Sequence, residues 1–223
     1  MQKTPARIHA VLFDLDGTLI DTERLGAASW DYAGEELGLV VDEGVKRQMV
    51  GRTLPDIQAI VRRALPESDA DLLLERANHH YHRLVTEVPP EVKAGARELL
   101  AWLQARGVPM AVATSSRGFQ AEDKLMRTGL REYFPVIVAG DGVQRGKPDP
   151  EIFLTAAERL GFCAGDCVVF EDSGPGIEAA ERSGALAVLV PERWPADPAL
   201  TLFAHHVLRD LTQAPALLEP LLI

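Results

Sequence analysis

The stretch over residues 11–21 constrains the fold more than any other part of the chain. An apolar run over residues 8–13 predicts a buried parallel strand, and Asp14 follows at the point where such a strand ends and a ligand crevice usually begins. Asp16 lies two residues further on, and Gly17 allows the backbone to bend sharply. Both carboxylates can therefore point into the crevice, which is costly unless a cation neutralises them.

The hydrophobic pattern divides the rest of the chain into a helical insertion and an alternating region. Over residues 22–86, apolar residues recur at helical spacing and strand-like runs are almost absent. After Pro90, short apolar strands alternate with helices, which predicts a parallel sheet with helices on both faces. We therefore expect an α/β fold with a Rossmann-like parallel sheet core, formed by residues 1–20 and 90–223. We also expect an inserted α-helical domain at 21–89.

The alternating region can be divided into individual elements. Strands are predicted from short apolar runs, and helices from segments that end near a glycine. The predicted strands cover residues 109–113, 136–139, 167–170 and 186–190, and the predicted helices cover residues 96–105, 119–128, 150–160 and 176–183. The tail has a weaker pattern, for which we expect a strand at 204–208 and a short closing helix at 211–222.

Composition disfavours several classes of partner. The chain has 223 residues with 47% hydrophobic content, which is enough to bury a sizeable core. Its formal net charge of -10 argues against a nucleic acid or an anionic membrane as partner, because either would favour a basic face. We find no apolar stretch of membrane-spanning length and no signal peptide pattern. We therefore expect a cytoplasmic protein. We also expect a monomer that acts on a small molecule.

Polar side chains follow four successive strands of the predicted sheet. Ligands of such sheets bind at the carboxyl ends of the strands, so these side chains are expected to share one edge. Each of them alone could be a turn or helix-cap residue, but their combination points to a site. The positions are Asp14 and Asp16 after the first strand, Thr114 and Ser115 after the second, Lys147 after the third, and Glu171 with Asp172 after the fourth.

The chemistry of this cluster points to phosphoryl transfer. Several carboxylates close together favour a cation, and oxygen ligands suit Mg²⁺, which also binds substrate phosphate oxygens. Lys147 adds a positive charge and Thr114 adds a hydroxyl donor, as a phosphoryl group requires. A carboxylate in such a site can attack phosphorus and form an aspartyl-phosphate. A second carboxyl group two residues away could transfer the protons.

These motifs together resemble those of the haloacid dehalogenase superfamily, in the phosphatase branch with a helical cap. Within that branch, the chain resembles the proteins that are similar to beta-phosphoglucomutase and to pseudouridine-5'-phosphatase. The motifs are Asp14-Leu-Asp-Gly-Thr18, Thr114 after a strand, Lys147 in Gly-Lys-Pro-Asp-Pro150, and Glu171-Asp172 followed by Ser173-Gly-Pro-Gly176.

The resemblance implies a role for each motif residue. Asp14 would be the nucleophile and Asp16 the general acid and base. The side chains of Asp14 and Asp172 and the carbonyl of Asp16 would bind Mg²⁺, with Glu171 bound directly or through water. Phosphate would be held by the side chains of Thr114 and Lys147 and by the backbone amide of Ser115.

Substrate choice is expected to come from the insertion and from the loop after Thr114. In the segment Val50-Gly-Arg-Thr53, Arg52 is a candidate cationic contact, although a surface charge explains it equally well. Thr22 and Glu23 begin the first helix of the insertion and are candidate substrate contacts; helix capping also explains Thr22. Ser116 and Arg117 could reach the leaving group.

Three alternatives to the hydrolysis of a phosphate ester compete with this interpretation. Dehalogenation is disfavoured because the chain carries both Asp16 and the Glu171-Asp172 pair. A phosphomutase of the beta-phosphoglucomutase type would place a histidine and an arginine where this chain has Gly26 and Leu54. A noncatalytic nucleotide-binding protein would explain the glycines of 174–179, but the adjacent carboxylates would repel a pyrophosphate.

We therefore predict a phosphoric monoester hydrolase, specifically a magnesium-dependent phosphatase that works through an aspartyl-phosphate. Its substrate is expected to be a small soluble phosphomonoester, of the sugar phosphate or nucleoside monophosphate type. The catalytic loops do not distinguish between these substrates, because the leaving group lies outside them.

Overall fold

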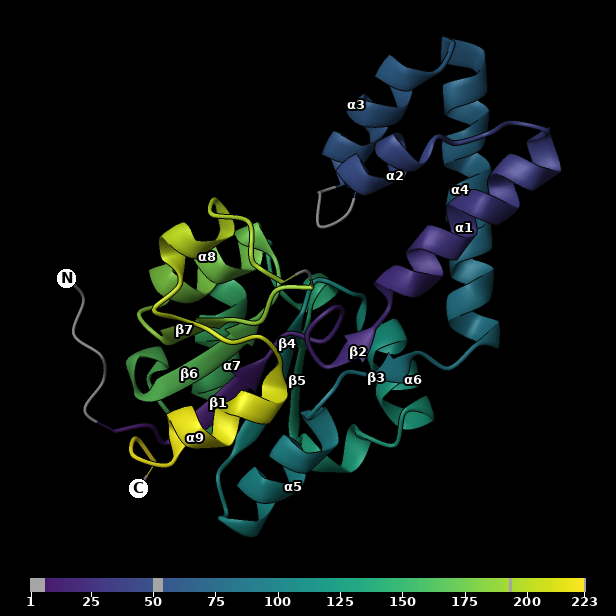
Figure 1. The fold of residues 1–223 in the computed structure, drawn as a ribbon. Coiled ribbons are helices and arrows are strands. Elements are labelled where there is room, and N and C mark those ends of the chain that lie inside the picture. Colours follow the sequence, from purple (N-terminus) through teal and green to yellow (C-terminus); the bar gives the residue numbers. More distant parts are fainter. Residues whose placement is uncertain (1–6, 50–53, 193, 223) are drawn as a thin grey trace. The chain divides into compact units, whose positions relative to one another are not determined.

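The computed structural model describes residues 7–49, 54–192 and 194–222. The chain forms two compact units, one made of Met1–Ile20 together with Glu91–Ile223, and the other made of Asp21–Pro90 (Figure 1). Within the described part of the chain, no helix is long and apolar enough to cross a membrane.

A six-stranded sheet forms the centre of the first unit (Figure 1). All of its strand pairs are parallel, and the strand order is β5-β4-β1-β6-β7-β8. The strands are β1 (Ala10–Phe13), β4 (Met110–Thr114), β5 (Val136–Ala139), β6 (Cys167–Glu171), β7 (Leu186–Leu189) and β8 (His206–Val207). Because β1 lies between β4 and β6, the loops that follow these three strands meet at the centre of one sheet edge.

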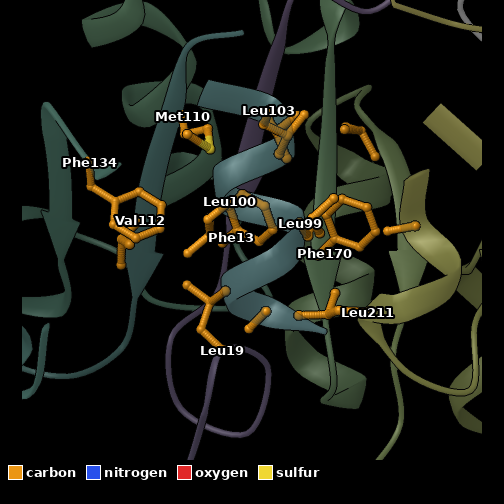
Figure 2. Packing of buried hydrophobic residues seen from close by; sticks show 14 of the residues in the cluster. Phe13, Leu19, Leu99, Leu100, Leu103, Met110, Val112, Phe134, Phe170 and Leu211 are labelled. Carbon is orange, nitrogen blue, oxygen red and sulfur yellow. The ribbon is translucent and has the colours of Figure 1, made fainter. Parts of the chain in front are cut away.

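Successive residues of β1 point to opposite faces of the sheet, and each face has its own apolar core. Val11 and Phe13 belong to the cluster on one face, whereas Ala10 and Leu12 belong to the cluster on the other. On the first face, Phe13 stacks on Phe170 of β6 with ring centroids 5.3 Å apart. Figure 2 shows the leucines of helix α5 lying over these two rings.

Helices from the first unit cover both faces of the sheet, as the alternating pattern predicts. One cluster contains buried residues of α5 (Ala96–Ala105), α6 (Gly118–Arg127) and α9 (Ala214–Leu218). The other contains buried residues of α7 (Glu151–Leu160) and α8 (Gly174–Arg182). The predicted Rossmann-like α/β class is confirmed.

The tail differs from its prediction in extent. The expected strand over 204–208 is present only as the two residues of β8. The expected closing helix over 211–222 is divided into a 3₁₀ turn, η5 (Leu211–Gln213), and the five-residue α9. Pro215 has no backbone N–H to donate, so it fits the first turn of a helix and not its interior. The α-helix therefore begins at Ala214, next to this proline, and not at Leu211.

The second unit is helical and has its own core. Its helices are α1 (Glu23–Leu37), α2 (Glu43–Met49), α3 (Leu54–Ala64) and α4 (Glu67–Glu87). Buried apolar side chains from all of this region pack together, namely Ala33, Val41, Met49, Val61, Ala70, Leu73 and Ala77. A two-stranded sheet that the sequence did not predict, formed by β2 (Ile20–Asp21) and β3 (Glu91–Val92), flanks this segment in the chain.

Candidate active site

The loop after β1 begins with Asp14, the first candidate site residue, which is only 6% exposed. The Asp14 amide donates to the carbonyl of Phe170, so the loop begins against the end of β6. The turn that follows needs Gly17, because its φ of +89° is one that side-chain-bearing residues rarely adopt. A Cβ at this position would also collide with the Asp172 carboxylate. The turn therefore brings the loop of β1 close to the loop of β6.

Three carboxylates meet at this edge of the sheet. One oxygen each from Asp14, Glu171 and Asp172 lies within 4.8 Å of the others. Glu171 ends β6 and is 1% exposed, while Asp172 is the next residue. Thr18 Oγ1 donates to Asp172 Oδ1 at 2.9 Å, which helps to orient that carboxylate.

The N-terminal end of α8 holds Glu171 in place. The backbone amide and hydroxyl of Ser173 donate to Glu171 Oε2 at 2.7 and 3.0 Å. Ser173 is also the N-cap of α8, where its Oγ accepts from the Gly176 amide at 3.1 Å. A Cβ on Gly176 would overlap the Glu171 carboxylate. This glycine is therefore required by the close packing of α8 against the acidic cluster.

Lys147 supplies the positive charge of the cluster. Its Nζ donates to Asp14 Oδ1 and, at 2.7 Å, to Glu171 Oε1, and its side chain is 5% exposed. Burial acts to lower the pKa of Lys147, but the Asp14 and Glu171 carboxylates outweigh it and raise that pKa above its usual range. Lys147 is therefore a fixed cation at neutral pH.

The pKa of the Asp14 carboxyl group is far from its ordinary value. Burial raises the pKa of Asp14 to about 7, the Lys147 ammonium opposes this rise, and the Glu171 and Asp16 carboxylates add to it. Without a metal, the positive charge of Lys147 therefore does not offset the negative charge of all these carboxylates. A small divalent cation fits this set of oxygen donors, because it would offset the remaining negative charge.

Asp16 belongs to a second cluster beside the first. Its Oδ2 accepts from Ser116 Oγ at 2.7 Å and, more weakly, from Thr114 Oγ1 at 3.4 Å. Its Oδ1 accepts from Lys124 Nζ at 2.6 Å. The Asp16 side chain is 26% exposed, whereas Lys124 is 3% exposed. The two aspartates of the first loop are thus held by different lysines.

The structure brings most of the predicted core residues together. Asp14, Glu171, Asp172 and Lys147 form the first cluster, and Asp16 and Thr114 form the second. In the loop after β4, Ser115 is exposed, and its carbonyl lies against Gly140, where a Cβ would collide with it. The chemical roles of all these residues stay predictions.

The predicted substrate contacts have a different outcome. Ser116 lies beside Asp16, and Arg117 is exposed at the N-cap of α6. Thr22 is buried at the N-cap of α1, and the side chain of Glu23 lies outside the described part of the structure. The prediction for Arg52 also falls on a residue outside the described ranges.

Lys124 is the site residue that sequence reasoning missed. It lies in the middle of α6 and is 108 residues away from its partner Asp16. A usable signal was present, because Lys124 and Leu125 follow Ala121 at i+3 and i+4 spacing, which places all three on one buried side of the helix. A lysine on the apolar face of a helix needs a buried partner, but the spacing alone does not identify that partner.

The fold and the site together indicate the class of protein. A parallel α/β sheet with an acidic cluster and a buried lysine at its strand ends is a scaffold for hydrolytic phosphoryl chemistry. A family model described as haloacid dehalogenase-like hydrolase matches residues 11–190, and the chain belongs to that family.

Comparison with individual proteins agrees with this assignment. The chain is 36% identical over 178 residues to a phosphorylated carbohydrates phosphatase of Thermotoga maritima, covering 79% of this chain and 82% of the relative. It is 31% identical over 195 residues to beta-phosphoglucomutase of Bacillus subtilis, covering 84% and 85%. The crystal structure of a HAD family hydrolase from Deinococcus radiodurans R1, with bound phosphate and sodium, has a TM-score of 0.77 at 31% identity, covering 98% of this chain and 97% of that one. The predicted family and the predicted enzyme class, a phosphoric monoester hydrolase, are confirmed.

Proposed function

We propose that this protein is a magnesium-dependent phosphatase that hydrolyses a small soluble phosphomonoester through an aspartyl-phosphate on Asp14. One observation carries the proposal. The buried Asp14 carboxylate lies within 4.8 Å of two further carboxylates and is bound by a buried lysine, Lys147. A structural ion pair needs one acid for one lysine, whereas this excess of oxygen donors suits a cation and a phosphoryl group.

The first half of the reaction transfers the phosphoryl group to the enzyme. Asp14 attacks phosphorus, and a new bond forms to its carboxylate oxygen as the bond to the ester oxygen breaks. Asp16 donates a proton to the departing ester oxygen. Thr114, Lys147 and the Ser115 amide hold the phosphoryl oxygens. The side chains of Asp14, Asp172 and Glu171 and the carbonyl of Asp16 would hold Mg²⁺, which would supply positive charge to offset the carboxylates and the phosphate.

The second half regenerates the enzyme. Asp16, now ionised, takes a proton from a water molecule, which attacks the phosphorus of the aspartyl-phosphate. The acyl phosphate bond breaks, which frees the Asp14 carboxylate and releases inorganic phosphate. The same carboxyl group therefore acts first as an acid and then as a base, so Asp16 must be held within reach of both oxygens in turn.

A sugar phosphate is the substrate class that we favour. The relative from Thermotoga maritima is named for its action on phosphorylated carbohydrates, and it shares 36% identity with this chain. A nucleoside monophosphate is the other candidate. Selectivity would come from the insertion, through Arg52, Thr22 and Glu23, and from Ser116 and Arg117 in the core.

A phosphomutase is the second candidate function, favoured by the 31% identity to beta-phosphoglucomutase. Hydrolysis is preferred because Gly26 and Leu54 stand at the positions where the mutase pattern has a histidine and an arginine. Neither glycine nor leucine can donate a hydrogen bond from its side chain to the second phosphate of a bisphosphate intermediate.

Phosphate release from a panel of esters tests the proposal. The panel contains glucose 1-phosphate, fructose 1-phosphate, phosphoglycolate and uridine 5'-monophosphate, each assayed with Mg²⁺ and with a chelator. We expect release from at least one ester to fall about a hundredfold or more on chelation and to return when Mg²⁺ is added back. No release from any ester, or a rate that chelation leaves unchanged, would contradict the proposal. Conversion of glucose 1-phosphate to glucose 6-phosphate in the presence of a bisphosphate activator would favour the mutase.

A further inference from the structure

Lys124 is a buried cation that the mechanism above does not use. It lies on α6, and only 3% of the residue is exposed. Burying an ammonium group is costly unless its donors are satisfied. Lys124 Nζ donates to Asp16 Oδ1 at 2.6 Å and to Ser116 Oγ at 3.0 Å. Its position on the apolar face of the helix is therefore tied to these two partners.

The three side chains form a closed arrangement around one carboxylate. Ser116 Oγ accepts from Lys124 and donates its own proton to Asp16 Oδ2 at 2.7 Å. Each oxygen of Asp16 thus has a separate donor, with Lys124 on Oδ1 and Ser116 on Oδ2. Two donors on two oxygens fix the plane of a carboxylate, whereas a single donor would let it rotate.

The neighbouring lysine does not share this task. Lys147 Nζ donates to Asp14 and Glu171, so the two lysines serve separate acids. The Asp16 side chain is 26% exposed and keeps a face open beyond its donors, while the Lys124 side chain is 4% exposed. A substrate could therefore reach Asp16 but would find Lys124 covered. This geometry suits a residue that acts through Asp16 and makes no contact with substrate.

We propose that Lys124 is the positioning residue of Asp16 and holds its carboxyl group in the orientation for proton transfer to the departing ester oxygen and from the attacking water. The inference rests on the proposed function, because it assigns a purpose to the lysine only if Asp16 is the acid and base. Proton transfer depends on placing the donor within hydrogen-bond reach of the receiving oxygen. A misplaced Asp16 should therefore harm only those substrates whose leaving group needs a proton.

The test compares two substrates in the full-length protein with Mg²⁺. p-Nitrophenyl phosphate releases a stable phenolate that needs no proton, whereas an alkyl ester such as fructose 1-phosphate releases an alkoxide that does. The readout is kcat/KM, which extends to the departure of the leaving group and leaves out the later hydrolysis. For Lys124→Met we expect kcat/KM to fall about tenfold to a hundredfold for the alkyl ester and less than about threefold for the aryl ester. Lys124→Arg keeps the charge and should restore part of the loss.

Two further variants separate a positioning role from a structural one. Asp16→Asn should show the same selective loss, and adding Lys124→Met to it should cause no further selective loss if the lysine acts through Asp16. Arg127→Met removes a partly exposed ion pair with Asp123 on the same helix, and it should leave both substrates unaffected. Equal losses with the two esters, or an undiminished effect in the Asp16→Asn background, would overturn the inference.

The outcomes also distinguish this inference from the proposed function. If the wild-type protein releases phosphate from no ester of the panel, the proposed function fails. If the wild-type protein turns over both esters and Lys124→Met keeps their ratio of kcat/KM, only the positioning role fails. Should Lys124→Met not fold, Lys124→Gln takes its place in the same comparison, because it removes the charge and shortens the side chain but keeps hydrogen-bond donors at its end.

Discussion

The raised pKa of Asp14 links the stability of the fold to pH. Burial raises the pKa of Asp14 to about 7, against the opposing effect of Lys147. The unfolded chain has an ordinary carboxyl with a pKa of about 4. Between about pH 4 and about pH 7, the folded, metal-free protein therefore holds a proton on Asp14 that the unfolded chain has lost. The contribution of Asp14 to the free energy of unfolding is therefore fully present below about pH 4, where both states hold the proton, and it is lost as pH rises through about 7.

Magnesium should reverse that loss. A carboxylate must be ionised to bind a metal, so Mg²⁺ competes with the proton on Asp14. We predict that saturating Mg²⁺ raises the thermal unfolding midpoint by several degrees more at about pH 8 than at about pH 5. Differential scanning calorimetry of the wild-type protein and of Asp14→Asn measures the effect. Equal Mg²⁺ shifts at both pH values would show that Asp14 is not linked to the metal.

The grouping of residues at strand ends was predictable, whereas the contact between Lys124 and Asp16 was not. The carboxyl ends of neighbouring parallel strands share one sheet edge, so Asp14 and Glu171 could be placed together from their strands alone. The contact between Lys124 and Asp16 depends on which turn of α6 faces the loop after β1. That information lies in the packing of a helix against the sheet, and the local pattern does not contain it.

At the scale of elements, the turn after β1 determines whether the acidic cluster can form. Gly17 has a φ of +89°, and its Cα lies so close to the Asp172 carboxylate that a Cβ would collide with it. Asp172 in turn accepts a hydrogen bond from Thr18 at 2.9 Å. The β1 turn and the start of the β6 loop are therefore packed together without room for a methyl group.

Gly17→Ala should disrupt that packing. We expect a loss of about 1–3 kcal/mol in the free energy of unfolding, because the added methyl group meets both backbone strain and the Asp172 carboxylate. We also expect the Mg²⁺ concentration for half-maximal activity to rise about tenfold or more, since Asp172 must move. Denaturant unfolding and a Mg²⁺ titration measure the two effects. Gly142→Ala is the matched control, because a Cβ there meets nothing within 4 Å; similar results for the two variants would refute this account of the turn.

Element boundaries followed the sequence where apolar residues dominate. The predicted strand over 136–139 coincides with β5, and the predicted helix over 96–105 coincides with α5. The tail was less predictable because its elements are short and partly 3₁₀, so their stability comes from packing against the sheet. Leu211 and Leu218 of this tail are buried in the same cluster as Phe13.

At the scale of the whole molecule, the chain contains separate cores that match the change of pattern along the sequence. Both faces of the sheet are packed by residues of the first unit, and the helical unit has its own cluster. The change from helical to alternating periodicity near residue 90 could therefore be read without the structure. Substrate selectivity could not be read in the same way, because it depends on side chains that contact a particular leaving group.

The central claim is that Asp14 attacks phosphorus. The most direct measurement is the initial rate of phosphate release by Asp14→Asn and by the wild-type protein, with saturating Mg²⁺ and the best ester of the panel. The amide has nearly the same shape as the carboxylate but is a far weaker nucleophile, and calorimetry verifies that the variant is folded. We predict a rate at least about a thousandfold below that of the wild-type protein. A folded Asp14→Asn protein that releases phosphate at the wild-type rate would contradict the mechanism.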